Sequence, residues 1–424
     1  MQRLLSLLGP SRSFRSLLVA ALADDLAKGI ATFLLPLVAV TLTSSPVHVA
    51  AVTVALTVPW LIVGPVAGLL VDRVDRRRLL VAAESVRLVA LLLLAVALLG
   101  DLASLPLLYI VALVVGVTET AIEPALMASI PQVSRRAHLD RANARVIGGR
   151  TITDNIAQVV SGALASLGLG IAALAAALGF AMAGDGYRRM RGTFAAGTSR
   201  VDRAADRPVG ERIRGTGRAI AGGMHVILAT EPLRTITLAS AVINGCWAAW
   251  WSVWALYVLA PGPVGLTPFG LGMLMTVGTV SSLFGATLAL PVQRMAGRRW
   301  AIGINILGNA ALFGITAATS EVWPIAFALL LGDFGAPGWA IAANTWQQRN
   351  VPEDLRGRVA SAYRVLGFGA KAIGAAAGGV IAGQLGIPVL YALCAAATLG
   401  TMVPFFRKVT ETAMQADPVV RPQK

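Results

Sequence analysis

Charged residues, histidine and cysteine are scarce in this chain of 424 residues. Only 13% of the residues are charged, whereas a typical soluble domain has about 25%. Cys246 and Cys394 both lie in apolar stretches, which argues against a disulfide framework or a metal site. His48, His138 and His225 are scattered, and the sequence has neither a catalytic triad nor a phosphate-binding loop of the pattern Gly-x-x-x-x-Gly-Lys-Ser/Thr. We therefore expect no enzymatic activity, no cofactor and no metal ion.

Apolar residues, by contrast, make up 56% of the chain, and the mean hydropathy is +0.72. Such a chain would need an unusually large core unless lipid covers much of its surface. The runs Leu88–Gly100, Leu105–Gly116 and Ala370–Gly383 each sit in a nearly uncharged stretch of about 20 residues, the length that crosses a bilayer. The sequence predicts an all-α integral membrane protein with twelve transmembrane helices. They are expected at residues 16–42, 48–71, 79–100, 104–130, 143–167, 169–184, 233–259, 266–292, 300–319, 322–345, 358–383 and 386–406.

The formal net charge of +15 follows an alternating pattern along the chain. Lys and Arg gather in every second segment between the predicted helices. This positive-inside pattern predicts that both termini and the basic loops are cytoplasmic. A nucleic-acid-binding protein would concentrate basic residues on one folded polar face, so we expect no nucleic-acid partner. The intervening segments contain neither Lys nor Arg: residues 43–47, 100–104, 167–170, 260–266, 320–322 and 384–386.

The longest hydrophilic segment, residues 185–230, divides the chain near its middle. We predict an N-terminal six-helix bundle at residues 1–184, a basic cytoplasmic linker at 185–230, a C-terminal six-helix bundle at 231–406 and a cytoplasmic tail at 407–424. Within the linker, Val209–Ile227 has the pattern of an amphipathic helix on the membrane surface, although a solvated linker is the simpler interpretation. Its basic charge favours anionic lipid in either case.

Two stretches of the first half recur faintly in the second half. Asp72–Arg78 matches Gln293–Arg299, and Leu139–Gly162 matches Leu355–Gly378 at constant spacing. Duplicated halves are typical of secondary transporters, whose binding sites lie where the halves meet. The repeat therefore predicts two pseudo-symmetric bundles around a central cavity.

The segment Gly68–Arg78 closely resembles the loop motif Gly-x-Leu-Ala-Asp-Arg-x-Gly-Arg-Arg/Lys of the major facilitator superfamily, which lies between the second and third helices of that family. It departs from the motif at Asp75, where the family has Gly. Val351–Arg358 resembles the segment before the eleventh helix in the enterobactin-exporter and multidrug-exporter branches. Gly162–Leu167 lacks the proline and final glycines that antiporter branches carry in the fifth helix. The resemblance implies a monomeric transporter that works by alternating access.

In the family that this chain resembles, the loop motif latches the cytoplasmic side of the protein. The aspartate that matches Asp72 lies near the start of the eleventh helix, where the helix dipole favours an anion. The arginines that match Arg73 and Arg76 make cytoplasmic charge contacts. The resemblance therefore implies gating roles for these three residues, while Arg77 and Arg78 are interpreted as topology signals.

Several charged residues interrupt the predicted membrane helices, where such residues are costly and usually functional. The pairs Glu119/Glu123 and Arg150/Asp154 are each four residues apart, so each pair shares a helix face. The resemblance implies that helices 1, 4, 7 and 10 line the central cavity, so the carboxylates in helices 1, 4 and 10 are candidate cavity residues. The candidate proton-coupling or substrate-binding residues among the charged side chains are Asp24, Asp25, Lys28, Glu119, Glu123, Arg150, Asp154 and Asp333.

A carboxylate in such a cavity can bind and release a proton, since desolvation favours its neutral form and a neighbouring cation favours its charged form. We favour Glu119, Glu123 and Asp25 as proton or cationic-substrate sites. The alternative is a static network of buried ion pairs that holds helices 1, 4 and 5 together. Glu84 and Arg87, near a helix end and outside the expected cavity, are interpreted as structural.

Four tryptophans form a stripe on the seventh predicted helix: Trp247, Trp250, Trp251 and Trp254. The stripe would let an apolar, aromatic or cationic substrate stack on it, with Asn244 as a polar contact one turn earlier. The alternative is an interfacial aromatic belt combined with helix packing, which suits Trp254.

These patterns together favour a proton-coupled exporter of a small amphipathic or lipophilic molecule. Its expected partners are that substrate, protons and membrane lipids. The alternatives are a lipid or lysolipid transporter or an uncoupled facilitator of the same superfamily, and a transporter-derived sensor that shows no solute flux. The composition, rich in Ala and Arg with few Lys, is typical of a GC-rich bacterial genome, so the expected location is the bacterial cytoplasmic (inner) membrane.

Overall fold

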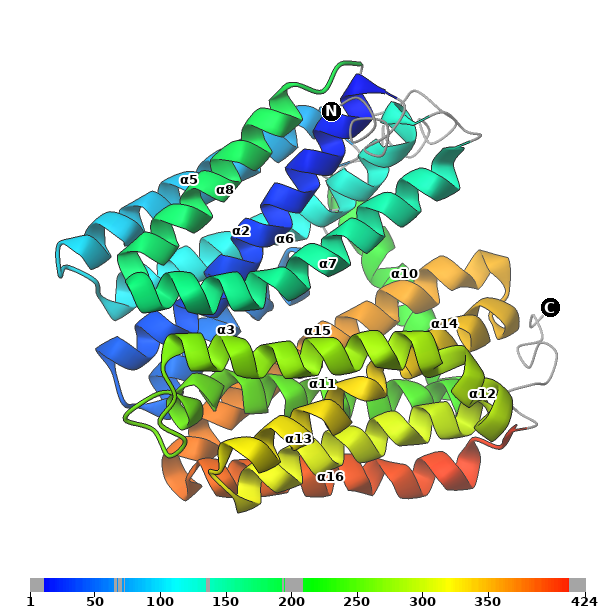
Figure 1. Ribbon diagram of the computed structural model, residues 1–424. Helices are drawn as coiled ribbons and strands as arrows, with labels where there is room; N and C mark the ends of the chain where they lie inside the picture. Colours follow the sequence, from blue (N-terminus) through cyan, green and yellow to red (C-terminus); the bar gives the residue numbers. More distant parts are fainter. Residues whose placement is uncertain are drawn as a thin grey trace. The chain divides into compact units, whose positions relative to one another are not determined.

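The computed structural model describes residues 11–64, 67, 71, 73–134, 138–192, 194 and 209–411. Figure 1 shows that the regular elements in these ranges are α-helices. They are α2 (Arg12–Leu42), α3 (Pro46–Ile62), α5 (Arg76–Leu99), α6 (Leu105–Val133), α7 (Leu139–Leu167), α8 (Leu169–Arg188), α10 (Val209–Ala229), α11 (Glu231–Val258), α12 (Pro268–Ala318), α13 (Val322–Phe334), α14 (Ala336–Asn350), α15 (Glu353–Leu385) and α16 (Ile387–Lys408).

Nine helical segments within the described ranges are long and apolar enough to cross a membrane, with α13 and α14 counted as one segment. One of them, α12, has 51 residues and would be about 77 Å long, more than twice a bilayer core of about 30 Å. Its backbone breaks at Gly297, where φ is 84°, so α12 supplies two spans. α3 is shorter than the other spans, and α7 carries charged residues. These two helices complete the predicted twelve, and the all-α membrane fold class is confirmed.

The chain forms two compact units. α3, α10 and α12 contribute residues to both units. The predicted division at residues 184, 230 and 406 stays a prediction. The first unit consists of Met1–Leu42, Ala55–Ile213 and Thr267–Met273, and the second consists of Thr43–Val54, Arg214–Leu266 and Leu274–Lys424.

Close helix contacts hold the first unit together. α2 packs against α8, α7 and α6, and α5 packs against α8 and α6. α2, in dark blue, runs beside the green α8 in Figure 1. Gly179 and Gly186 of α8 allow this approach, because a Cβ at either position would lie 2.8 Å from the Cβ of Ala27 or Ala20 in α2. This packing encloses polar side chains of α2, α5 and α6 within one bundle.

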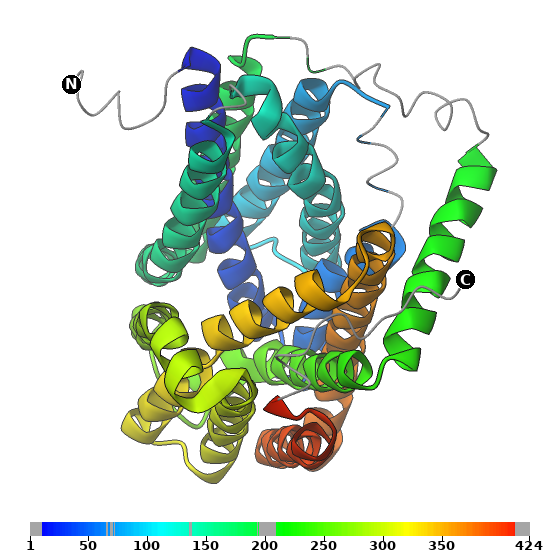
Figure 2. The same ribbon diagram turned by 90° about the vertical axis from the view of Figure 1, so that its right-hand side faces the viewer.

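The second unit is organised around α11, which packs against α15 and α16. The green α11 and orange α15 run side by side (Figures 1 and 2). They approach at two glycines, Gly245 of α11 and Gly374 of α15. α10 covers the residues that the sequence predicts as an amphipathic helix, and its Gly223 lies against the backbone of Arg358 in α15.

The helix start that follows the break in α12 is capped by Glu411, a residue after α16. The backbone N–H groups of Arg298 and Arg299 donate to the two carboxylate oxygens of Glu411, both at 3.0 Å. At the start of a helix such N–H groups have no acceptor within the helix itself, and the dipole there also favours an anion. The positive φ of Gly297 favours glycine at the turn itself. The segment after α16 therefore fixes the start of the ninth span.

Candidate functional site

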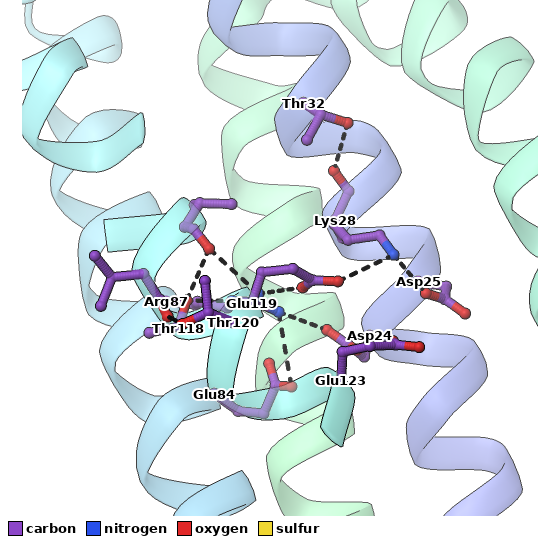
Figure 3. A network of polar contacts seen from close by, with 12 residues as sticks. Asp24, Asp25, Lys28, Thr32, Glu84, Arg87, Thr118, Glu119, Thr120 and Glu123 are labelled. Carbon is purple, nitrogen blue, oxygen red and sulfur yellow. Dashed lines mark hydrogen bonds and ion pairs between the residues drawn. The ribbon is translucent and has the colours of Figure 1, made fainter. Parts of the chain in front are cut away.

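A group of charged side chains lies inside the first unit, on α2, α5, α6 and α7. Figure 3 shows its members on α2, α5 and α6. Each of these helices has a polar position facing its neighbours, although the surrounding residues are apolar. We call the group the buried charge network. It consists of Asp24, Asp25, Lys28, Glu84, Arg87, Glu119, Glu123 and Arg150.

Arg87 of α5 is the centre of this network and is fully buried. Its Nη1 donates to Asp24 Oδ1 at 2.8 Å, its Nη2 donates to Glu119 Oε2, and its Nε donates to Thr118 Oγ1 at 2.7 Å. The guanidinium also lies over the ring of Phe180, 5.3 Å from the ring centroid. One side chain therefore connects α5 with α2, α6 and α8.

A second group of ion pairs meets at Asp25 of α2. Arg150 of α7 donates to both carboxylate oxygens, with Nε 2.5 Å from Oδ2 and Nη2 2.9 Å from Oδ1. This two-point geometry is the strongest form of an arginine–carboxylate pair. Lys28 Nζ lies 2.8 Å from Asp25 Oδ1 and 3.5 Å from Glu119 Oε1. Arg150 Nη1 lies 2.8 Å from Glu123 Oε2, so the network continues to its most exposed carboxylate.

The two innermost carboxylates have fewer donors than they can use. Glu84 is fully buried, and its side-chain oxygens accept no hydrogen bond from any other residue that the structure describes. Arg87 Nη1 lies 4.0 Å from Glu84 Oε1, and it is already bonded to Asp24. Asp24 Oδ2 likewise accepts no hydrogen bond from the described part of the chain. Because both carboxylates approach Arg87, two partly unsatisfied acids lie close together (Figure 3).

Glu84 and Arg87, interpreted from the sequence as structural residues outside the expected cavity, lie in contact with candidate residues. Arg87 contacts Glu119, one of the favoured candidates, so α5 belongs to the network. Helical periodicity shows that Glu84 and Arg87 share a face of α5, but it does not show which helices that face meets. Two charges three residues apart in the apolar stretch that follows the basic start of α5 were the available signal.

The remaining candidates form no ion pair with the network among the residues that the structure describes. Asp154, one turn after Arg150 on α7, is exposed. Asn244, Trp247 and Asp333 lie in the second unit, where they line one cavity. The predicted residues thus fall into two places, one in each unit.

The cavity of the second unit has a volume of about 350 Å³ and is lined from α11, α12, α13, α14 and α15. This volume is within the range of small-molecule sites, about 300–1,000 Å³. Lys371 of α15 is a lining residue that was not among the candidates, although a lone lysine in an apolar helix was a signal for it. The polar and aromatic lining residues are Ser240, Asn244, Trp247, Asn305, Asn309, Asp333, Trp339 and Lys371.

The tryptophan stripe of α11 divides between this cavity and the core. Trp247 lines the cavity and stacks on Trp251, with ring centroids 5.5 Å apart. Trp250 and Trp254 are 1% and 2% exposed, and their centroids are 4.2 Å apart. Trp250 and Trp254 are therefore core residues that pack inside the unit. Trp254 does not belong to an aromatic belt on the surface. Only Trp247 of the four lines the cavity.

Replacing Trp250 with phenylalanine is expected to lower the free energy of unfolding by about 2 kcal/mol. The change removes the hydrogen bond from Nε1 to Thr316 Oγ1, 3.3 Å long, and leaves a cavity beside the smaller ring. Trp247→Phe is the matched control, since that ring lines an open cavity. Thermal unfolding in detergent measures both variants, and equal losses would show that Trp250 is not a core residue.

The predicted gating residues are partly described. Asp72 lies outside the described residues. Arg73 is exposed, and Arg76 begins α5, where its Nη1 donates to Ala128 O of α6 at 3.2 Å. Asp75 caps the same helix start through its side chain, which gives a physical reason for an aspartate where the loop motif has Gly. The gating role of these residues stays a prediction.

Comparisons with known proteins agree with this architecture. The family model described as Major Facilitator Superfamily matches residues 17–370. A search of curated proteins finds no match. Among solved structures, a bacterial homologue of the iron transporter ferroportin in the inward-facing state has a TM-score of 0.71 at 17% identity, covering 93% of this chain and 98% of that chain. The nucleoside transporter NupG has a TM-score of 0.67 at 13% identity, covering 94% and 99% of the two chains.

A bacterial homologue of the human lysosomal transporter Spinster, in an inward-facing and unoccupied conformation, has a TM-score of 0.66 at 15% identity, covering 96% of this chain and 98% of that chain. At such identities the structural similarity shows the fold alone. The family model, however, spans most of the sequence, and transporters of this family bind small-molecule substrates and typically work as single chains. The chain therefore belongs to the Major Facilitator Superfamily, as a multi-pass membrane transporter.

Proposed function

We propose that this transporter exports a small amphipathic or lipophilic molecule in exchange for protons, by alternating access. The charge imbalance of the buried charge network carries the proposal. Its five carboxylates face three cations, so its formal charge is −2. Uncompensated charge inside a membrane protein is costly, and the uptake of protons removes it. The network thus has a physical reason to bind protons.

The exposure of the carboxylates supports a route for those protons. The side chain of Glu123 is 35% exposed and that of Glu119 is 14% exposed, whereas Asp24 and Glu84 are 0% exposed. Protons would enter at the more exposed carboxylates. The deeper pair would hold them, since both oxygens of Glu84 and Oδ2 of Asp24 accept no hydrogen bond from the described part of the chain.

Protonation of Glu119 would also change the contacts between helices. Its charged carboxylate pairs with Arg87 of α5 and with Lys28 of α2. A neutral Glu119 would weaken both pairs at once, because each depends on the negative charge. A cationic substrate group would compete for the same carboxylate. Such competition links substrate release to proton binding, which is the requirement for exchange.

Membrane placement is part of the same proposal. On α5, Val86, Val89, Leu93 and Val96 are between 49% and 65% exposed and follow helical spacing, which suits contact with membrane lipids. The positive-inside pattern supports cytoplasmic termini, and the composition supports a bacterial cytoplasmic membrane. Asp72, Arg73 and Arg76 would then latch the cytoplasmic side.

Substrate-induced proton movement in proteoliposomes tests this function. A pH dye reports the protons, and lipophilic cations, antibiotics, siderophores and lysolipids are the test compounds. Wild type is expected to move protons with an exported compound. Glu119→Gln should reduce that movement by about tenfold or more, the effect of about 1.4 kcal/mol of lost coupling. Further variants show how much each of the other carboxylates contributes to proton movement: Asp25→Asn, Glu123→Gln and Glu84→Gln.

Glu353→Gln is the matched control, because Glu353 is 87% exposed and, among the described residues, forms an ion pair with Arg356 of its own helix, at 3.5 Å. It should leave proton movement unchanged. Solute flux without proton movement, equal in all variants, would instead indicate an uncoupled facilitator or a lipid transporter. The network would then be a static set of ion pairs.

A further inference from the structure

The cavity of the second unit contains two opposite charges that do not neutralise each other. Asp333 reaches it from α13 and Lys371 reaches it from α15. Neither side chain forms an ion pair with any residue of the described ranges, and the two do not pair with each other. An unpaired charge is costly in a membrane protein and usually marks a site where a ligand supplies the partner.

The surroundings of the two charges differ in chemistry. Lys371 Nζ lies 5.4 Å from the ring centroid of Phe368, so its neighbour within the same helix is apolar. Asp333 lies against Gly278, where a Cβ would lie 3.2 Å from the carboxyl carbon, so the absence of a side chain there leaves room for the carboxylate. Each charge is thus accommodated without a counter-ion.

Neutral acceptors complete the lining. Asn244 Nδ2 donates to Ser240 O at 2.8 Å, and Asn309 Nδ2 donates to Asn305 O at 2.9 Å. Each amide nitrogen therefore has a partner, while neither amide oxygen accepts a hydrogen bond from another residue that the structure describes. Amide oxygens and a carboxylate are the groups that bind an ammonium. Trp247 adds an aromatic face.

The charges of Asp333 and Lys371 together disfavour any ligand that carries a single charge. A cation placed in the cavity would be attracted by Asp333 but would leave Lys371 unpaired and be repelled by it. An anion would be attracted by Lys371 but would leave Asp333 unpaired and be repelled by it. Only a molecule that carries both a positive and a negative charge can pair with both Asp333 and Lys371. The cavity, of about 350 Å³, also limits this molecule to a small one.

We propose that this cavity binds a small zwitterion, with its cationic group at Asp333 and its anionic group at Lys371. The inference rests on the proposed transport function, and it narrows the substrate from amphipathic molecules in general to amphipathic zwitterions. Asn244 and Asn309 support the cationic end, and Trp247 contacts the apolar part.

A set of three compounds with one phenethyl frame tests the charge requirement: zwitterionic phenylalanine, cationic phenethylamine and anionic 3-phenylpropionate. Binding is measured on the purified full-length protein in detergent, by titration calorimetry and by tryptophan fluorescence. Phenylalanine is expected to bind about tenfold to hundredfold more tightly than either singly charged compound, since each of these lacks one charge-assisted contact.

Two substitutions should change the preference in opposite directions. Asp333→Asn is expected to weaken phenylalanine binding and shift selectivity toward 3-phenylpropionate, and Lys371→Gln is expected to shift it toward phenethylamine. A purely structural role would lower all affinities together. Glu353→Gln should leave the order unchanged, because Glu353 is 87% exposed.

The outcomes separate this inference from the proposed function. Zwitterion-selective binding without proton movement in proteoliposomes would support the site and refute proton coupling. Proton movement with a lipophilic cation, together with no preference for phenylalanine in detergent, would support coupling and overturn the zwitterion site. Absence of binding by all three compounds would overturn it as well.

Discussion

Arg87→Ala is expected to lower the free energy of unfolding by about 3–5 kcal/mol, enough to leave little folded protein. The change leaves Asp24 and Glu119 buried without the guanidinium that pairs with both. Glu84, already poor in donors, loses its nearest cation. Thermal unfolding and the monodisperse yield after detergent extraction measure the effect.

The matched control is Arg189→Ala, which removes an arginine from an exposed pair. Arg189 is 73% exposed and pairs with Asp185 at 2.6 Å, so its loss should cost less than about 1 kcal/mol. Neutralising the stranded carboxylates, with Asp24→Asn and Glu119→Gln added to Arg87→Ala, should recover part of the stability. Equal stability of Arg87→Ala and Arg189→Ala would show that Arg87 is not the centre of a buried network.

The sequence predicted the members of the network better than its connections. The four-residue spacing correctly placed Glu119 and Glu123 on one face of α6, because helical periodicity is a local property. Glu119 nevertheless pairs with Arg87 and Lys28, whereas Glu123 pairs with Arg150. Which cation each carboxylate reaches depends on how α2, α5 and α7 pack around α6. A single sequence does not encode that in any local pattern.

The membrane spans and the tryptophan stripe show the same difference between local patterns, which the sequence reveals, and contacts, which depend on the fold. Hydropathy and the basic segment near residue 297 predicted two spans at 266–292 and 300–319, although the helix is interrupted only at Gly297. For the stripe on α11, periodicity correctly placed Trp247 and Trp250 on neighbouring positions. Periodicity could not show that Trp247 lines the cavity whereas Trp250 lies in the core. That distinction depends on contacts with other helices, such as the hydrogen bond from Trp250 to Thr316.

Gly374→Leu is expected to lower the free energy of unfolding by about 3 kcal/mol or more, because it separates α11 from α15. A Cβ at Gly374 would lie 2.7 Å from the Cα of Gly245, and backbone atoms cannot move aside as a side chain can. One turn later, a Cβ at Gly378 would lie 2.8 Å from the Cα of Ala249, so the two helices touch backbone to backbone. Thermal unfolding in detergent measures the loss.

Gly367→Leu is the matched control on the same helix, since a Cβ at Gly367 meets no other atom within 4 Å. It should be neutral or slightly stabilising, because leucine favours a helix more than glycine does. Packing in a membrane depends on such contacts, since lipid supplies no hydrophobic force between helices. A large cost at Gly374 and none at Gly367 would therefore show that close backbone contact, and not the helix propensity of glycine, holds the second unit together. Similar costs at both positions would contradict the α11–α15 crossing.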